Sequence, residues 1–434
     1  LRIIFTIAKL WKIMNKKIFL LILNLCLLWN ISAQKTTLIM GGVAHLGTGE
    51  KIENSLIVIR DGKFDLVADA SVVRIDPSAF DTVIRAYGKH IYPAFIAPNT
   101  TLGITEIDAV RASKDYNEVG SYNPNVRSQI AYNTDSKIIK TVRTNGVLIT
   151  QATPRGGVIS GLSSVMYLDG WNWEDATLKA DDGIHLNWPS SFNTSGWWAE
   201  PGPTSKNKNY DDRVKKIKHY FEIAKSYSKD DSKMDLELVS IKELFKGTRN
   251  LYIHANYAKD IRESVRFFKK IGINNIVIVG GRDALNAISI LKENNISIIL
   301  ERVHSLPVNE DAAIDQFYKL PSQLSENNIL FCLSYSGDME AMGTRNLPFT
   351  AGTAVAYGLD MEKAIASISL NTAIILGIEK TTGSIEIGKN ATFFISSGDA
   401  LDMRTNNIEL AFIKGIPVDL NNHQKELFEK YKNR

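Results

Sequence analysis

The sequence of 434 residues contains little cysteine and little histidine: two Cys and seven His. Cys26 lies in an N-terminal leader, so removal of the leader leaves only Cys332 and excludes an intrachain disulfide. The sequence also lacks a basic cluster interleaved with aromatic residues, which argues against a nucleic-acid partner. No glycine fingerprint follows the first strand of the central region, which counts against a dinucleotide-binding sheet.

Residues 14–33 have the order of a secretory signal peptide. The basic stretch Met14-Asn15-Lys16-Lys17 precedes an apolar run from Ile18 to Trp29, and Ile31-Ser32-Ala33 provides small residues before Gln34. The run is shorter than the roughly 20 residues that a membrane-spanning helix needs. We therefore expect cleavage and a secreted or periplasmic protein without a membrane anchor. Residues 1–33 carry five cations, Arg2, Lys9, Lys12, Lys16 and Lys17, and no acid, so their removal changes the formal net charge from +4 to about −1.

Both ends of the remaining chain are rich in strand signals. Ser55 to Ile59 is a β-branched and apolar run that turns at Asp61-Gly62, which is a strong hairpin signal. Residues 383–420, after the last helical segment, again show strand signals. The patterns predict one small β-sandwich domain built from residues 34–92 and 383–420, followed by a charged tail over 421–434.

The central region, residues 93–382, alternates short apolar strands with helical stretches. Strands apolar on both faces, recurring about every 20–30 residues with helices between them, indicate a parallel sheet covered by helices. We predict a distorted (β/α)8 barrel, with an open doubly wound sheet as the alternative. The strands on which this prediction depends are 251–254, 276–279, 296–300 and 329–333.

An insertion precedes the strand that ends at His254. Residues 210–227 and 236–245 are charged and predict surface helices. Before them lies an aromatic stretch with Trp188, Trp197 and Trp198. It fits packing over the barrel opening or a lid over a ligand, and the sequence leaves both open.

Three segments, in a fixed order along the chain, carry recognisable motifs. The opening segment is 38–62, which contains Gly41-Gly42 and Asp61-Gly62. The second is Asn371-Thr372-Ala373 with Leu376-Gly377, and the third is Gly383-Ser384-Ile385-Glu386 with Gly388-Lys389-Asn390-Ala391. Together they span almost the whole chain and resemble the amidohydrolase superfamily, most closely its imidazolonepropionase-like branch. The resemblance implies a barrel with a composite sandwich and hydrolysis of carbon–nitrogen bonds by a metal-activated water.

Most ligands that the resemblance implies are missing. The family places His-x-His after the first barrel strand, but Asn99 and Thr101 stand there. His254 keeps the place of the fifth-strand histidine, while Gly280-Gly281-Arg282 at the sixth strand offers no imidazole. Asp338 matches the last ligand, which the family also uses as general base. Amide and hydroxyl oxygens are poor zinc ligands, so the set leaves two alternatives open: one divalent ion, zinc or manganese, or no metal.

We therefore assign candidate roles around the barrel mouth. His254 and Asp338 are the candidate catalytic residues and metal ligands, although a hydrogen-bonded histidine and a turn or helix-capping carboxylate explain them equally simply. Other polar residues are candidates for ligand binding, and each arginine among them has the alternative of an acidic partner. These ligand-binding candidates are Asn99, Thr101, Arg282, Arg302, His304 and Arg345, with Arg155 as a further arginine.

Two main functions compete. The first is a hydrolase acting on a small amide, cyclic amide or dipeptide-like substrate. The second is an inactive relative that binds a small amide-like ligand, or that assembles with itself or with a related active barrel. A third hypothesis is a carbohydrate-binding surface formed by Trp171, Trp173, Trp188, Trp197 and Trp198.

Overall fold

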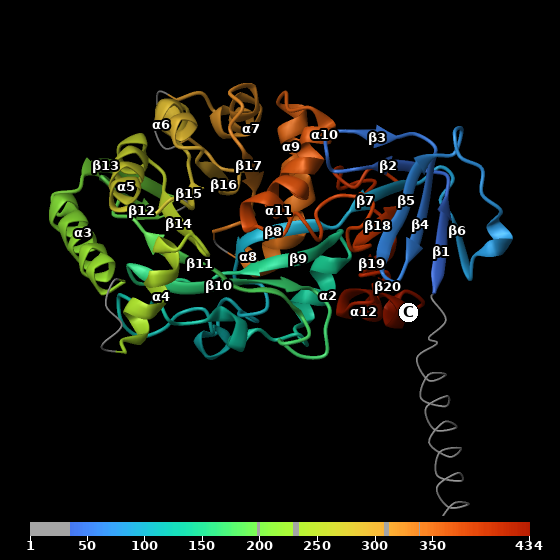
Figure 1. The fold of residues 1–434 in the computed structure, drawn as a ribbon, viewed down its shortest axis with the longest axis horizontal. Coiled ribbons are helices and arrows are strands. Elements are labelled where there is room, and N and C mark those ends of the chain that lie inside the picture. The colour runs from blue at the N-terminus through green and yellow to red at the C-terminus, as the bar shows by residue number, and fades with distance from the viewer. Residues whose placement is uncertain (1–34, 198–199, 229–233, 308–311, 338) are drawn as a thin grey trace, which may run out of the picture.

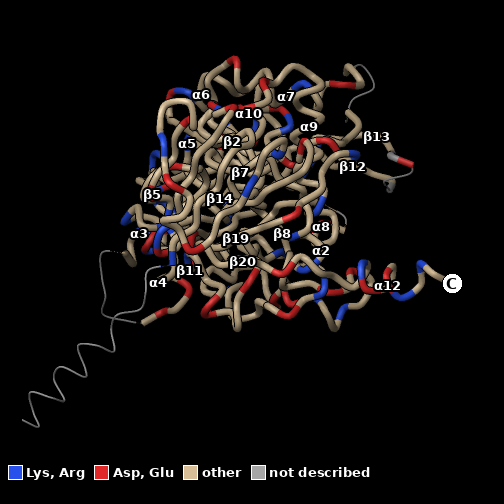
Figure 2. The backbone as a smooth tube through the Cα atoms, turned by 90° about the vertical axis from the view of Figure 1, so that its right-hand side faces the viewer, with Lys and Arg blue, Asp and Glu red and all other residues tan. Residues whose placement is uncertain are grey.

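The computed structural model describes residues 35–197, 200–228, 234–307, 312–337 and 339–434. The predicted signal peptide and Asp338 lie outside these residues. A strand-rich end, on the right of Figure 1, adjoins a larger helix-covered barrel. No helix in the described ranges is long and apolar enough to cross a membrane. Positions of both charges, Lys and Arg as well as Asp and Glu, are scattered over the backbone (Figure 2).

The first sheet of the strand-rich end comes entirely from the N-terminal region. Its order is β5-β4-β1-β6. The predicted turn at Asp61-Gly62 joins β4 to β5, and both turn residues have positive φ, +50° and +73°, as a two-residue hairpin turn requires. The strands are β1 Thr36–Met40, β4 Ser55–Arg60, β5 Lys63–Asp69 and β6 Thr82–Arg85.

The second sheet combines strands from both chain ends. Its order is β20-β19-β18-β7-β2-β3, and β18 pairs antiparallel with β7 across about 300 residues of sequence. Buried Ile39, Ile57, Phe393 and Phe412 form one apolar cluster between the two sheets, which stabilises them by removing apolar surface from water. The strands are β2 Val43–His45, β3 Lys51–Ile52, β7 His90–Pro93, β18 Phe393–Ser396, β19 Ile408–Ile413 and β20 Ile416–Pro417.

Eight strands form the barrel sheet in the order β17-β16-β15-β14-β11-β10-β9-β8. Neighbours are parallel except at β10, which runs antiparallel to both β9 and β11. The strands are β8 Phe95–Thr100, β9 Val147–Ala152, β10 Ile159–Tyr167, β11 Thr177–Asn187, β14 Asn250–Ala255, β15 Ile276–Gly280, β16 Ser297–Leu300 and β17 Phe331–Leu333. The predicted distorted barrel is confirmed. The strict alternation of strands and helices is absent at β9–β11, where turns and loops connect the strands.

A helical turn closes the barrel between its two edge strands. The Ile368 carbonyl accepts a hydrogen bond from the Ile96 amide of β8 at 2.8 Å, and the Asn371 side chain donates to the Phe331 carbonyl of β17 at 3.1 Å. Within the described residues no ladder joins β8 directly to β17. The segment predicted to match the family through Asn371 therefore joins the first barrel strand to the last.

Helices cover the outside of the barrel (Figure 1). In α5, Ile261, Val265 and Phe268 recur at helical spacing on the buried face, and Gly272 ends the helix with φ +101°. The covering helices are α2 Lys137–Arg143, α5 Ala258–Ile271, α6 Ile288–Glu293, α7 Gln316–Glu326, α8 Glu340–Gly343, α9 Leu347–Ala356, α10 Met361–Ser367 and α11 Leu370–Leu376. Short 3-10 turns lie at Pro77–Ala79, Arg111–Ser113, Ser128–Ala131, Ala284–Ala287 and Thr344–Asn346.

The insertion contains both predicted surface helices, α3 Tyr210–Tyr227 and α4 Leu236–Phe245. The aromatic stretch before them forms a hairpin of β12 Phe192–Trp197 and β13 Glu200–Lys206. Trp188 is buried and donates from Nε1 to the Tyr210 hydroxyl at 3.2 Å, so it is a packing residue. Trp198 lies outside the described residues. The predicted charged tail contains the exposed helix α12 His423–Tyr431.

Candidate functional site

Two cavities open at the carboxyl ends of the parallel strands, the end of a barrel at which functional sites are built. The first, of about 560 Å³, is lined by residues that include Asn99, Thr101, Arg155 and Glu340. The second, of about 730 Å³, lies beside the β12–β13 hairpin. His254, near the end of β14, lines both. We call them the Arg155 cavity and the hairpin cavity.

Arg155 makes the densest set of polar contacts in its cavity. Its guanidinium donates to the Asn99 side-chain oxygen at 2.9 Å and to the Asn99 carbonyl at 2.8 Å. Nε and Nη2 each lie 3.1 Å from a carboxylate oxygen of Glu340. Arg155 thus joins the loop after β9 to β8 and α8. The planar guanidinium suits such a fork, which holds its charge in one place.

Asn99 adopts a backbone conformation that explains part of this geometry. Its φ is +51°, in the left-handed region where Asn is several-fold enriched over most other residues, and the register of β8 against β9 shifts here. Its amide donates to the Gln151 side chain at 2.9 Å. The irregular end of β8 therefore presents the carbonyl and side-chain oxygens of Asn99 to Arg155.

A buried chain of hydrogen bonds leads away from His254. Nε2 of His254 lies 3.0 Å from Nδ1 of His185 on β11, and Nε2 of His185 lies 2.9 Å from Oγ of Ser163 on β10. Ser163 donates to the Asp182 carboxylate at 2.7 Å. Asp182 also accepts from the Tyr252 hydroxyl at 2.6 Å and from the Gln151 amide at 3.0 Å. We call Asp182, Ser163 and His185 the relay.

The electrostatics of the relay favour neutral imidazoles. Burial, reinforced by the positive charge of Arg155, lowers the pKa of His254 to about 3. Burial, together with His254 and Arg155, also holds the pKa of His185 well below its usual value. Burial raises the pKa of Asp182, while the hydrogen bonds from Tyr252, Ser163 and Gln151 oppose that shift. Both histidines are therefore uncharged at neutral pH.

The described residues do not fit the metal centre that the resemblance implies. Outside the masked positions, no group of three His, Cys, Asp or Glu side chains is placed to hold a metal ion, whereas a catalytic zinc takes three protein ligands. Nδ1 of His254 is a suitable metal donor, but Asn99 is engaged by Arg155, and β15 ends at Gly280 and is followed by Gly281. The fixed guanidinium adds a positive charge that repels a divalent cation.

The other predicted ligand-binding residues are dispersed. Arg282 lines the hairpin cavity, pairs with Glu301 at 3.3 Å and stacks over Phe317. Arg302 lies over the ring of Tyr335, and neither it nor Arg345 lines either mouth cavity.

His304 is exposed, with its Nε2 atom 2.6 Å from the Thr353 hydroxyl. Thr101 lines the Arg155 cavity, and Asp338 lies outside the described residues. Of the arginines considered, Arg155 makes the contacts at the centre of the mouth.

Sequence reasoning missed the relay and Glu340. Ser163, Asp182 and His185 are buried polar residues in β10 and β11, and buried polar residues require partners. The identity of those partners follows from sheet register, because β11 pairs with β14 so that Asn187 faces His254. Glu340 lies 185 positions after Arg155 in the chain, and no local pattern links them.

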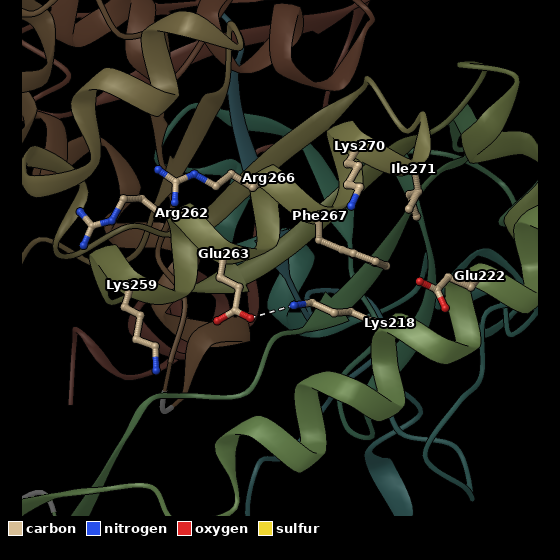
Figure 3. Close-up of a pocket in the computed structure, with 9 residues that line it drawn as sticks. All are labelled: Lys218, Glu222, Lys259, Arg262, Glu263, Arg266, Phe267, Lys270 and Ile271. Atoms are coloured by element: carbon tan, nitrogen blue, oxygen red, sulfur yellow. Dashed lines mark hydrogen bonds and ion pairs between the residues drawn. The ribbon is translucent and has the colours of Figure 1, made fainter.

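A third hollow lies away from the mouth and is lined only by residues of α3 and α5. Lys218 pairs with Glu263 at 2.8 Å. Figure 3 shows this pair, with Arg262, Arg266 and Lys270 also on α5. It contains none of the predicted site residues. The charged side chains here belong to the outer surface of the barrel.

Comparison with known proteins agrees with this architecture. Residues 240–418 match the amidohydrolase family. An amidohydrolase from Thermotoga maritima MSB8 is 21% identical, with a TM-score of 0.75 over 88% of this chain and 99% of that chain. A putative prolidase from Bifidobacterium longum is 15% identical, with a TM-score of 0.53 over 92% of this chain and 99% of that chain.

An adenosine deaminase from Xanthomonas campestris with bound zinc is 13% identical, with a TM-score of 0.51 over 92% of this chain and 97% of that chain. The comparison with curated proteins gives no match. The solved structures share the fold of this chain, and the amidohydrolase family match covers its residues 240–418. This family usually uses a divalent metal such as zinc, so the mouth of this chain departs from it.

Proposed function

We propose that this protein binds a small amide-like organic ligand at the barrel mouth without the metal-activated hydrolysis of its family. The observation that carries the proposal is the Arg155 guanidinium, held by Asn99 and by Glu340. It places a permanent positive charge beside the tip of β8, where the resemblance implies two metal-binding histidines. The mouth thereby has its own cation.

The state of His254 supports binding over catalysis. A general base works best with a pKa near the operating pH, whereas the pKa of His254 is lowered to about 3. Each pKa unit corresponds to about 1.4 kcal/mol, so protonating this imidazole at neutral pH costs about 5 kcal/mol. A neutral imidazole instead offers a hydrogen-bond acceptor to a ligand.

The competing function is hydrolysis of a carbon–nitrogen bond with His254 and Asp338 holding one zinc or manganese ion. Metal analysis separates the two. The mature protein is incubated with excess zinc or manganese, desalted and assayed for bound metal, beside His254→Ala and the exposed control His304→Ala. We expect no stoichiometric metal in any of the three. Retention of one ion per chain that is lost only in His254→Ala would contradict the proposal and support the competing function.

The resemblance to the imidazolonepropionase-like branch, export through the signal peptide, and assembly with itself or a related barrel stay predictions. A ligand-binding barrel outside the cytoplasm agrees with all three. Mass spectrometry of the mature protein tests export, with Gln34 as the expected first residue. Size-exclusion chromatography with light scattering tests assembly.

A further inference from the structure

We propose that the relay holds His254 in one neutral tautomer, protonated at Nε2, so that Nδ1 accepts a hydrogen bond from a hydroxyl or amide N–H group of the ligand. This inference rests on the proposed ligand-binding function and adds the chemistry that the ligand must present. In it, Asp182, Ser163 and His185 are positioning residues, and His254 is the residue that contacts the ligand.

The direction of proton donation along the hydrogen bonds of the relay is set at Asp182. The Tyr252 hydroxyl accepts from the Asn250 side chain at 3.1 Å, so its own proton points to Asp182. The Ser163 hydroxyl directs its proton to the other carboxylate oxygen of Asp182. Ser163 Oγ also accepts from Gln151 at 3.2 Å. The other acceptor within reach of this proton is the Gly183 carbonyl, at 3.3 Å. In the contact with His185 the Ser163 oxygen therefore accepts.

The contact with Ser163 then determines which nitrogen is protonated in each of the two imidazoles. Because Nε2 of His185 donates to Ser163, neutral His185 has its lone pair on Nδ1. That lone pair accepts the proton on Nε2 of His254. His185 is fully buried and stacks on the ring of Tyr252, with centroids 4.6 Å apart, so its orientation is restrained. His254 is left with a lone pair on Nδ1.

The surroundings of His254 select the kind of group that can use this lone pair. Nδ1 has no hydrogen-bond partner among the residues that the structure describes. A carboxylate is repelled by the lone pair, and a cation is disfavoured by Arg155, whose charge acts on His254. An uncharged donor remains. The hairpin cavity adds side chains that both donate and accept or that stack, namely Asn187, Asn193, Asn256, Asn286, Gln316, Phe192 and Tyr257.

Nitrogen NMR of the mature protein labelled with ¹⁵N-histidine measures the tautomers directly. Resonances are assigned with His254→Gln and His185→Gln. We expect both His254 and His185 to be protonated at Nε2 and not at Nδ1 at neutral pH. A wild-type His254 protonated at Nδ1 overturns the proposal, whatever the variants do.

Asp182→Asn provides the sharper test. Two donors, Tyr252 and Gln151, face one oxygen of Asp182, so the amide oxygen stays there and the new NH₂ faces Ser163. Ser163 is then expected to donate to His185 at 2.9 Å in preference to the Gly183 carbonyl at 3.3 Å, and the hydrogen bonds reverse as far as Nδ1 of His254. We expect His254 to change to the Nδ1-protonated tautomer. The control is Asp181→Asn, which alters the adjacent carboxylate that pairs with Arg127 and leaves the tautomer unchanged.

A folded Asp182→Asn variant with an unchanged tautomer contradicts the proposal, and if that variant does not fold, Ser163→Ala serves. Loss of the hydroxyl is expected to leave His254 distributed between both tautomers. Titration with propionamide, acetate and zinc chloride tests the ligand chemistry. We expect the Nδ1 resonance to shift with propionamide and not with acetate; no response to propionamide, or a stronger one to acetate or zinc, overturns it. Zinc retention tests the proposed function separately.

Discussion

The guanidinium of Arg155 and the carboxylate of Glu340 form a two-pronged ion pair, with both nitrogen–oxygen distances at 3.1 Å. The Arg155 side chain is 23% exposed and that of Glu340 10%. Partial burial weakens the competition from water, so the pair is worth more than a surface pair. It fixes a positive charge in the mouth of a fold whose relatives usually hold a metal ion.

The ion pair is expected to contribute to stability as a coupled unit. Arg155→Met leaves the Glu340 carboxylate largely buried without its partner, and we expect the free energy of unfolding to fall by about 2–4 kcal/mol, somewhat less than for a fully buried pair. Urea denaturation of Arg155→Met, Glu340→Gln and the double variant measures the coupling. Additive effects would contradict the account. Arg404→Met, in an exposed pair with Asp402, is the control and should have no effect.

The buried His185 and the partly buried His254 predict a loss of stability toward acid pH. The pKa values of His254 and His185 are lowered in the folded state. Below about pH 6.5 the unfolded chain therefore binds protons that the folded chain does not. Stability is complete above that pH and falls as the pH decreases toward the folded pKa of His254, about 3. Each histidine contributes up to about 1.4 kcal/mol per pH unit.

His254→Gln removes one of these protons while keeping a donor for His185. We expect the slope of unfolding free energy against pH, between about pH 6 and pH 4, to decrease by about 1.4 kcal/mol per unit. Carboxylates that titrate in the same range are common to both proteins, so the difference isolates His254. The exposed His423→Gln is the control. Identical slopes for wild type and His254→Gln would show that His254 is not held neutral.

A histidine introduced at the end of β15 is expected to destabilise the protein. Gly281 has φ +66°, and a Cβ there would lie 2.9 Å from the Ile298 side chain. Gly281→His should therefore lower the unfolding free energy by about 2–4 kcal/mol, through backbone strain and the clash. Gly272→His, at φ +101° with open space around it, carries the strain alone and should cost about 1 kcal/mol. Equal costs in thermal or urea denaturation would contradict this.

Cys332 is expected to be unreactive in the folded protein. It lies in β17, is fully buried, and burial raises the pKa of its thiol far above the usual range. A thiol reagent such as Ellman's should label it only as fast as the chain unfolds, and labelling should become rapid in denaturant. Rapid labelling of the native protein would show that β17 opens readily.

The sequence was informative where patterns are local. Apolar runs such as Ile276 to Val279 predicted the parallel strands, and Asp61-Gly62 predicted its hairpin. The resemblance placed His254 at a strand tip. The reversal of β10 was not predicted, because a buried strand is equally apolar whether its neighbours run parallel or antiparallel.

The site itself depends on contacts that no local pattern encodes. His185 appeared to be an ordinary buried histidine, and its contact with His254 follows from the register of β11 against β14. Arg155 was one of several arginines available for an anion. Only the fold shows that Asn99 and Glu340 surround it, since these residues come from three separate parts of the chain.

Crystallography with zinc tests the central claim most directly. Crystals of the mature protein are soaked in zinc, and anomalous difference maps are recorded at the zinc edge. The account predicts guanidinium density between Asn99 and Glu340 and no anomalous peak within about 2–2.5 Å of Nδ1 of His254. A zinc peak bonded to His254, with the Arg155 side chain displaced from Glu340, would contradict it.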